Sequence, residues 1–455
     1  MPRMWRVTAW LEGKTPLSLS TERPLDSPPL FVIDSNRLQS ALPSKVERAH
    51  LALGSGGIDP LVAPFDAPKL DELMEESKID LILATSKHNV QYLLGGYRYH
   101  FFIHQDAIGV SRYLPVVGFQ RDRLDASFYI GNAFEWTQQE VSPPLWVGEI
   151  ANCCWSSEAA AQMAVELIRR RGLDRATIGI EPQFIPSDAA TIVARAFPSA
   201  AFVDATLVLE ELRAVKRPDE LAKVKEASDD TVRAMLTVMN SAAPGVSKED
   251  LLQMLKFEEA RLGLDFEYAL ISAGASFNRM PVAGGWNRGD VMSIDSGGNK
   301  DGYISDLTRM AVMAEPTSEM NELLAEVDAI QMGARRSIRA GVIGGGIYEA
   351  ALAEQARCPH SEKIEFTAHG MGLTSNEAPR LTDTGLVSYP ATHRDRMLAA
   401  GMVISIETQM LSPVGYLKLE DTVVVTDSGC EAYGDFARGW NRRGTEVISS
   451  LVSAH

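Results

Sequence analysis

Four acidic residues and one histidine in the second half of the chain interrupt segments that are otherwise apolar or rich in glycine. They are Asp295, Asp306, His369, Glu407 and Glu420. A carboxylate buried in an apolar strand without a partner is costly, so the fold has to supply partners for these groups. Four carboxylates and one imidazole suit Mn²⁺, Fe²⁺, Co²⁺ or Zn²⁺, and they could hold two such ions.

The two aspartates are predicted to lie on a β-hairpin. The run V-M-S-I-D-S-G-G is apolar up to Asp295 and then reaches glycines, which leave room for a metal ion. Asp306 follows after D-G-Y-I-S, so a returning strand would bring it back to Asp295. Taken singly, the aspartates could be turn residues, the histidine could be structural, and each glutamate could form a salt bridge with a residue such as Lys418.

Length and composition favour a soluble protein of two or three domains. The chain has 455 residues, of which 45% are hydrophobic and 23% charged. Its formal charge of −16 argues against nucleic acid or an anionic membrane as a partner. The four cysteines form no C-x-x-C motif and are expected to be free thiols. With no long apolar run and no signal peptide, a cytoplasmic location is expected.

Residues 1–60 are rich in proline and are interpreted as an irregular extension that wraps a surface or a partner subunit. Alternating helices and strands then predict an α/β domain with a mixed sheet. The helices are predicted at 69–77, 89–96, 157–171 and 187–197, and the strands at 79–85, 106–110, 114–119, 146–150, 177–181 and 202–206.

The stretch E-L-R-A-V-K-R-P-D-E-L, residues 211–221, marks a boundary between domains. Pro218 suits the first position of a helix, which would extend to about residue 241. Ser247 is a good N-cap for the next helix. Later helices are predicted at 248–263, 317–340 and 347–357.

The five motifs, in this order and spacing, resemble the pita-bread metalloenzyme family, which includes methionine aminopeptidase, aminopeptidase P, Xaa-Pro dipeptidase (prolidase) and creatinase. The resemblance covers roughly residues 211–430. The segments I-D-L-I-L-A-T and N-V-Q-Y-L-L-G are similar to a creatinase-type N-terminal domain, which methionine aminopeptidases lack.

The fold class that the resemblance implies is α/β (α+β), with a creatinase-type N-terminal α/β domain followed by a C-terminal pita-bread domain. The implied pita-bread fold is a curved antiparallel sheet flanked by two pairs of helices. The predicted boundaries are an extension at 1–60, domains at 61–212 and 213–436, and a C-terminal tail at 437–455.

The resemblance also implies roles for the five residues around two divalent ions, with manganese favoured over iron, cobalt or zinc. Asp295 would be a terminal ligand of one ion, Asp306 and Glu420 would bridge both, and His369 and Glu407 would bind the second. Glu407 would also relay a proton for a metal-bridging hydroxide, so Glu407 and His369 are the catalytic candidates. Creatinase has lost these ligands, whereas this chain keeps all five.

The residues around the predicted metals depart from the family pattern. Asn278 and Asn376 stand where prolidase-type peptidases have histidines, and Glu377 follows the second of them. Lys418 replaces the arginine that lies two residues before the last glutamate. Asparagine carries no proton or positive charge, and lysine lacks the bidentate fork of arginine. These four residues are candidate substrate-binding residues, and their pattern indicates a changed substrate or reaction.

Other polar residues are weaker candidates. The run G-Y-R-Y-H-F-F-I-H could reach a partner's active site in a dimer, which makes Arg98 and His100 substrate-binding candidates, together with Tyr99 and His104. An aromatic patch within the domain or at a subunit interface is the alternative for this run. His393 could supply a lost imidazole, although a solvated loop residue is preferred. For Trp286, core packing is preferred over a role in the pocket wall.

These observations predict a cytoplasmic, homodimeric, dinuclear-metal hydrolase of a small peptide, amide or amidine C–N bond, related to Xaa-Pro peptidases. Its substrate would be a short peptide or another small molecule, and neither nucleic acid nor a membrane is an expected partner. The first alternative is a non-peptidase member of the family, such as a lyase acting on dimethylsulfoniopropionate or a hydrolase of ectoine-like osmolytes. The second is a catalytically silent binding or scaffold protein.

Overall fold

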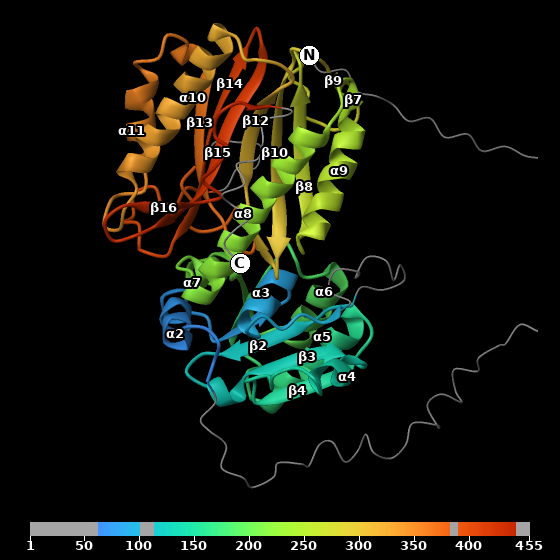
Figure 1. The fold of residues 1–455 in the computed structure, drawn as a ribbon. Helices are drawn as coiled ribbons and strands as arrows, with labels where there is room; N and C mark the ends of the chain where they lie inside the picture. The colour runs from blue at the N-terminus through green and yellow to red at the C-terminus, as the bar shows by residue number, and fades with distance from the viewer. Residues whose placement is uncertain (1–61, 101–112, 383–389, 443–455) are drawn as a thin grey trace, which may run out of the picture. The chain divides into compact units, whose positions relative to one another are not determined.

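A computed structural model describes residues 62–100, 113–382 and 390–442 (Figure 1). The predicted N-terminal extension, the expected strand at 106–110, His104 and most of the predicted C-terminal tail lie outside these ranges. Among the described residues, no helix is both long and apolar enough to cross a lipid bilayer.

The N-terminal domain is built on a mixed sheet of six strands in the order β4-β3-β2-β1-β5-β6. β1 is antiparallel to β2 and parallel to β5, and β3 is parallel to β4. These pairings confirm the expected α/β domain. The strands are β1 (Leu81–Ala84), β2 (Val116–Gln120), β3 (Phe128–Asn132), β4 (Glu149–Cys154), β5 (Thr177–Ile180) and β6 (Ala201–Asp204).

Six α-helices accompany this sheet in the described part of the domain. They are α2 (Ala67–Glu76), α3 (Lys87–Leu93), α4 (Glu135–Gln139), α5 (Ser157–Arg170), α6 (Ser187–Ala196) and α7 (Thr206–Arg213). α7 was not predicted, because its residues were assigned to the end of a strand and to a boundary. The strand expected at 146–150 instead runs from Glu149 to Cys154.

The C-terminal domain has a nine-stranded sheet whose main path is β11-β10-β12-β15-β14-β13. β8 pairs with β10, β16 with β15 and β17 with β12, and all pairings except β12 with β17 are antiparallel. The strands are β8 (Asp265–Ala273), β10 (Val291–Lys300), β11 (Tyr303–Ile304), β12 (Leu307–Val312), β13 (Ile364–Gly370), β14 (Val403–Ser412), β15 (Gly415–Val425), β16 (Cys430–Tyr433) and β17 (Asn441–Arg442).

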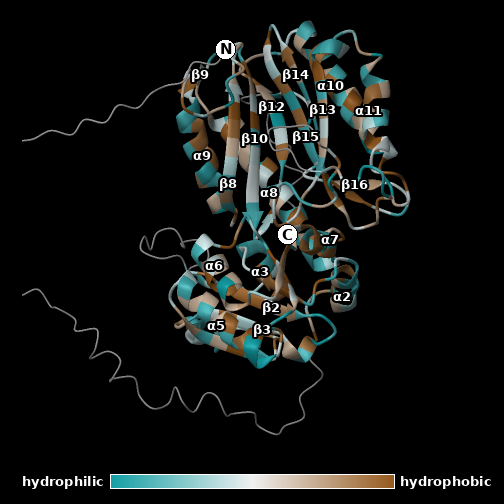
Figure 2. Cartoon of the chain, turned by 180° about the vertical axis from the view of Figure 1, so that it is seen from behind, coloured by the Kyte–Doolittle hydropathy of each residue, from teal (hydrophilic) through white to brown (hydrophobic). Residues whose placement is uncertain are grey.

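Two pairs of helices pack on this sheet, as the predicted pita-bread fold requires (Figure 1). α8 packs on β10 and α9 on β8, whereas α10 packs on β14 and β15 and α11 on β13. Figure 2 shows both hydrophobic and hydrophilic residues on these helices. They are α8 (Pro218–Ser241), α9 (Lys248–Arg261), α10 (Ser318–Ser337) and α11 (Gly346–Gln355).

Local sequence explains where the first pair of helices begins. Pro218 occupies the first turn of α8, and the Glu220 side chain accepts a hydrogen bond from the Arg217 backbone N–H. The Ser247 hydroxyl accepts one from the Asp250 N–H at 3.0 Å, which caps α9 as predicted. The helix expected to reach residue 340 ends at Ser337, because Ile338 adopts an extended backbone and packs in the core.

A buried ionic network joins the end of α7 and the segment after it to the loop that follows β13. Glu377 accepts hydrogen bonds from Arg213 Nε at 3.0 Å and from Lys216 Nζ at 2.9 Å, and all three side chains are at most 2% exposed. Arg213 also donates to Asn89 on α3. Burial alone would raise the pKa of Glu377, but Arg213 and Lys216 lower it to about 2.

This network gives a testable pH dependence of stability. The folded pKa of Glu377 lies below its ordinary value of 4.5, so its contribution is complete above pH 4.5 and is lost as the pH falls toward 2. The difference between the two pKa values corresponds to about 3 kcal/mol. Glu377→Gln should lower the unfolding free energy by about 3–5 kcal/mol at pH 7, since it leaves two buried cations without their carboxylate.

Urea unfolding at pH 7, 4.5 and 3.5 measures the effect, and the deficit of the variant should shrink over that series. Glu365→Gln, at an exposed carboxylate that pairs with Gln409, is the matched control and should change stability little. A deficit of Glu377→Gln that stays constant down to pH 3.5 would contradict the assignment.

Candidate metal centre

Strand register brings the candidate ligands to one face of the C-terminal sheet. Asp295 on β10 lies opposite Thr308 on β12, Thr308 lies opposite Glu420 on β15, and Glu420 lies opposite Glu407 on β14. Directly opposed residues of antiparallel strands point to the same face. The four side chains therefore form one continuous row across four neighbouring strands, which we call the carboxylate row.

A second row of side chains lies beside the carboxylate row, displaced from it by two residues along each strand. His369 on β13 is opposite Ser405 on β14, and Ser405 is opposite Thr422 on β15. Residues two apart on a strand share a face, so His369 faces the same side as Glu407 and Glu420. Asp306 immediately precedes β12, and its carbonyl oxygen accepts a hydrogen bond from Thr422 Oγ1 at 3.1 Å.

Three of the five candidates form a compact donor set. Ligand atoms of Asp306, His369 and Glu420 all lie within 4.8 Å of one another, and the three residues are buried. His369 Nε2 is 3.8 Å from Asp306 Oδ2. Two carboxylates and an imidazole are suitable donors for Mn²⁺, Fe²⁺, Co²⁺ or Zn²⁺. The residues present therefore fit one divalent ion at this position.

Hydroxyl groups orient the two carboxylates of this donor set. Glu420 accepts hydrogen bonds from Thr308 Oγ1 at 3.0 Å and from Ser405 Oγ at 2.8 Å. Tyr268 on β8 donates its hydroxyl hydrogen bond to Asp306 Oδ1. Hydrogen-bond donors of this kind fix the orientation of the ligand carboxylates and so increase their affinity for a metal ion.

The other two candidates, Asp295 and Glu407, are held by cationic side chains. Lys418 Nζ lies 2.7 Å from Asp295 Oδ2 and 2.5 Å from Glu407 Oε2, and it is also 2.9 Å from Glu420 Oε2. Arg279 forms an ion pair with Asp295, and its guanidinium lies 5.0 Å from the centre of the Tyr416 ring. Lys418 is thus the salt-bridge partner that the sequence suggested, and it pairs with three carboxylates at once.

The electrostatics reflect this crowding. Burial raises the pKa of Asp306 well above its usual range, and the nearby Glu420 and Asp295 carboxylates raise it further. Burial also raises the pKa of Asp295, partly opposed by Lys418. For Lys418, burial would lower the pKa, but Asp295, Glu420 and Glu407 raise it well above its usual range. The centre therefore favours an additional cation near Asp306.

A buried arginine supports the carboxylate row from within the strands. Arg309 is 0% exposed, and it donates to the carbonyl oxygens of Thr308 and Glu420, each at 2.8 Å. It also forms an ion pair with Asp421 at 3.1 Å. Burial alone would raise the pKa of Asp421, but Arg309 and Arg438 lower it to about 2. These contacts fix β12 against β15 at the residues that define the row.

The predicted substrate-binding residues of the C-terminal domain occupy different environments. Asn278 and Asn376 are exposed. The side chain of Asn278 accepts a hydrogen bond from the Met280 N–H at 2.9 Å, within its own turn. Glu377 is buried in the ionic network with Arg213 and Lys216. Among these candidates, Lys418 contacts three carboxylates at the centre. Substrate binding by any of the four stays a prediction.

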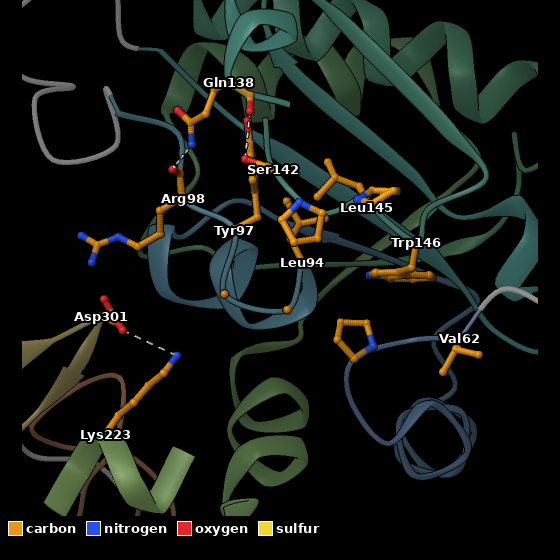
Figure 3. Close-up of a pocket in the computed structure, with 15 residues that line it drawn as sticks. Val62, Leu94, Tyr97, Arg98, Gln138, Ser142, Leu145, Trp146, Lys223 and Asp301 are labelled. Carbon is orange, nitrogen blue, oxygen red and sulfur yellow. Dashed lines mark hydrogen bonds and ion pairs between the residues drawn. The ribbon is translucent and has the colours of Figure 1, made fainter. Parts of the chain in front are cut away.

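One candidate of the N-terminal domain, Arg98, lies at a separate cavity of about 610 Å³. Arg98 lines it together with Lys223 and Asp301, and Figure 3 shows these side chains around the same hollow. None of the five predicted metal ligands lines this cavity. His100 is exposed, and its backbone N–H donates to Gln138 Oε1 at 3.1 Å. A role for Arg98 or His100 in specificity stays a prediction.

Two further sequence expectations have a clear outcome. The preference for His393 as a solvated loop residue is wrong, because it is 3% exposed and its Nε2 lies 3.0 Å from Glu211 Oε1. The flanking loop sequence is polar, but the imidazole is buried against α7. Trp286 is fully buried and packs in the core beneath α8 and α9, as preferred.

Three residues of the centre were not identified from the sequence. Tyr268, Arg279 and Arg309 contact the ligand candidates or their backbone. Arg279 directly follows the candidate Asn278, and its positive charge at that position was the available signal. Arg309 ends the motif S-D-L-T-R. The available signal was an arginine within an apolar strand, three residues after Asp306. Tyr268 had no local signal, since only the pairing of β8 with β10 brings it to Asp306.

Comparison with known proteins identifies the family. The model for metallopeptidase family M24 matches residues 222–427, and the model for the creatinase/prolidase N-terminal domain matches residues 68–215. The chain belongs to the pita-bread metallopeptidase family M24. The two matches meet within the segment that contains Lys216 and the start of α8. Each domain of this family member therefore carries its own independent match.

Individual relatives are distant. The chain is 28% identical over 247 residues to the uncharacterized peptidase YqhT of Bacillus subtilis. This alignment covers 51% of this chain and 66% of that protein. It is 24% identical over 231 residues to the Xaa-Pro dipeptidase of Pyrococcus furiosus. That alignment covers 49% of this chain and 64% of the relative. Both matches span slightly less than two thirds of the relative.

Solved structures agree with the fold. The structure of Xaa-Pro dipeptidase from Bacillus anthracis superimposes with a TM-score of 0.66 at 21% sequence identity. The superposition covers 83% of this chain and 98% of that chain. At this identity the likeness supports the two-domain fold alone.

Asp306→Asn tests the donor set directly. The substitution keeps the shape of the side chain but removes the negative charge, so the affinity for Mn²⁺ should fall at least about 100-fold. Isothermal titration of metal-free protein measures the affinity. The matched control is Asp301→Asn, at an exposed carboxylate whose Oδ2 lies 4.0 Å from Lys223 Nζ, and it should bind Mn²⁺ normally. An unchanged affinity of Asp306→Asn would contradict the assignment.

Proposed function

We propose that this protein is a metal-dependent hydrolase that cleaves the C–N bond of a short peptide or a related small amide. The convergence of Asp306, His369 and Glu420 into one buried donor set carries this proposal. Membership of metallopeptidase family M24 supports it, and so do relatives named as dipeptidases. Xaa-Pro dipeptides are accordingly the first substrates to test.

The chain supplies groups for each part of such a reaction. A divalent ion held by Asp306, His369 and Glu420 would lower the pKa of water and polarise a carbonyl group. Glu407 has 20% of its side chain exposed, unlike the nearly inaccessible Asp295 and Glu420. Glu407 is therefore the carboxylate that a substrate can reach, and we assign it the role of accepting and returning a proton.

A non-peptidase reaction of the same family is the second candidate, and the surroundings of the centre favour considering it. The two positions where prolidase-type peptidases use histidines are the exposed residues Asn278 and Asn376, which cannot transfer protons. In addition, Arg279 brings a guanidinium to Asp295. These features suit a substrate other than a proline dipeptide, such as ectoine or dimethylsulfoniopropionate.

A substrate screen of the manganese-loaded enzyme separates these functions. It should compare Xaa-Pro dipeptides, longer proline-containing peptides, ectoine and dimethylsulfoniopropionate. We expect hydrolysis of at least one C–N bond, with kcat/KM reduced at least about 100-fold in Asp306→Asn. In water enriched in oxygen-18, hydrolysis places the label in the product, whereas elimination gives an unlabelled alkene.

The controls distinguish the remaining alternatives. Removal of metal with a chelator should abolish activity, and Mn²⁺ should restore it. Cleavage without label incorporation would replace the hydrolase with a lyase. Protein that binds no metal and turns over none of the four substrate classes would support the scaffold alternative instead.

A further inference from the structure

Lys418 lies between the carboxylates of the carboxylate row. It lies two residues before Glu420 on β15, so both side chains project from the same face of the sheet. Its side chain is 4% exposed. The ammonium group has three N–H donors, and three carboxylates surround it at 2.5–2.9 Å. The hydrogen-bonding capacity of Lys418 is therefore satisfied by Asp295, Glu407 and Glu420 alone.

These contacts divide the five candidate ligands into two groups. Asp306, His369 and Glu420 form the compact donor set for one divalent ion. The other two, Asp295 and Glu407, are the residues that a second ion would need in addition to a bridging carboxylate. Both of them contact Lys418 Nζ, which stands among their oxygens as a cation would.

The charges of the centre lead to the same division. The four carboxylates of Asp295, Asp306, Glu407 and Glu420 carry four negative charges when ionised. Lys418 and Arg279, which both contact Asp295, offset two of these charges. One divalent ion offsets the remaining two, since a metal-binding imidazole is neutral. A second divalent ion would have to lie beside a buried ammonium group and compete with it for the same oxygens.

We propose that Lys418 takes the place of a second metal ion, so that the centre binds one divalent ion at Asp306, His369 and Glu420. The Lys418 ammonium group then holds Asp295 and Glu407 in the positions that a second ion would otherwise fix. This inference rests on the proposed metal-dependent function, and it replaces the two-ion centre that the resemblance to the family implies.

Metal stoichiometry tests the proposal without relying on activity. Full-length protein is freed of metal with a chelator, titrated with Mn²⁺ and analysed for bound metal after removal of excess. We expect one Mn²⁺ per chain for the unchanged protein and two for Lys418→Met, which keeps the length of the side chain but removes its charge. The matched control is Lys225→Met, at an exposed lysine paired with Asp229, and it should stay at one.

Electron paramagnetic resonance of the unchanged protein gives a second measurement that does not depend on any variant folding. At full loading, the spectrum should be that of an isolated Mn²⁺ ion, with six hyperfine lines and no exchange coupling. Two ions per unchanged chain, or an exchange-coupled spectrum, would overturn the inference and leave the proposed function standing. A folded Lys418→Met variant that still binds one ion would also overturn it. No bound Mn²⁺ in the unchanged protein would overturn both the inference and the proposed function.

Discussion

The cost of placing four carboxylates side by side inside a protein governs the organisation of the C-terminal domain. The pairing of β10, β12, β15 and β14 brings Asp295, Glu420 and Glu407 together, and Asp306 lies just before β12. Mutual repulsion and the loss of water both oppose ionisation of such groups. Two cationic side chains compensate this charge, namely Lys418 on β15 and Arg279 in the loop that follows β8. A divalent ion near Asp306 would complete this compensation.

The surrounding architecture serves to keep that arrangement rigid. The two helix pairs cover the sheet and bury its apolar residues, while both ends of the carboxylate row, Asp295 and Glu407, contact Lys418. Arg309 illustrates the principle, because it links the backbones of β12 and β15 at Thr308 and Glu420. A shift of one residue in either strand would turn the donor groups to the other face. The geometry of the candidate metal site therefore depends directly on the register of these strands.

The fold and the ligand candidates could be predicted from the sequence because each motif has a local cause. Apolar runs that end at glycine gave the strands, and Pro218 and Ser247 gave the helix starts. The additional side chains that contact the carboxylates come from distant parts of the sequence, and no local motif predicts those contacts. Arg279 and Tyr268 reach the carboxylates through the pairing of β8 with β10 and the turn that follows β8. His393 was misjudged for the same reason, since only tertiary packing buries it beside Glu211.

The ionic network around Glu377 has a consequence for the cooperativity of the whole described chain. Arg213 ends the last helix of the N-terminal domain, yet it contacts both Asn89 of that domain and Glu377 of the C-terminal domain. Opening either domain alone would expose one side of a buried charge cluster and leave the other side unpaired. The two domains should therefore unfold as one unit. A shortened chain that begins after α7 would keep the candidate metal ligands but would lose Arg213, one of the two cations that pair with Glu377.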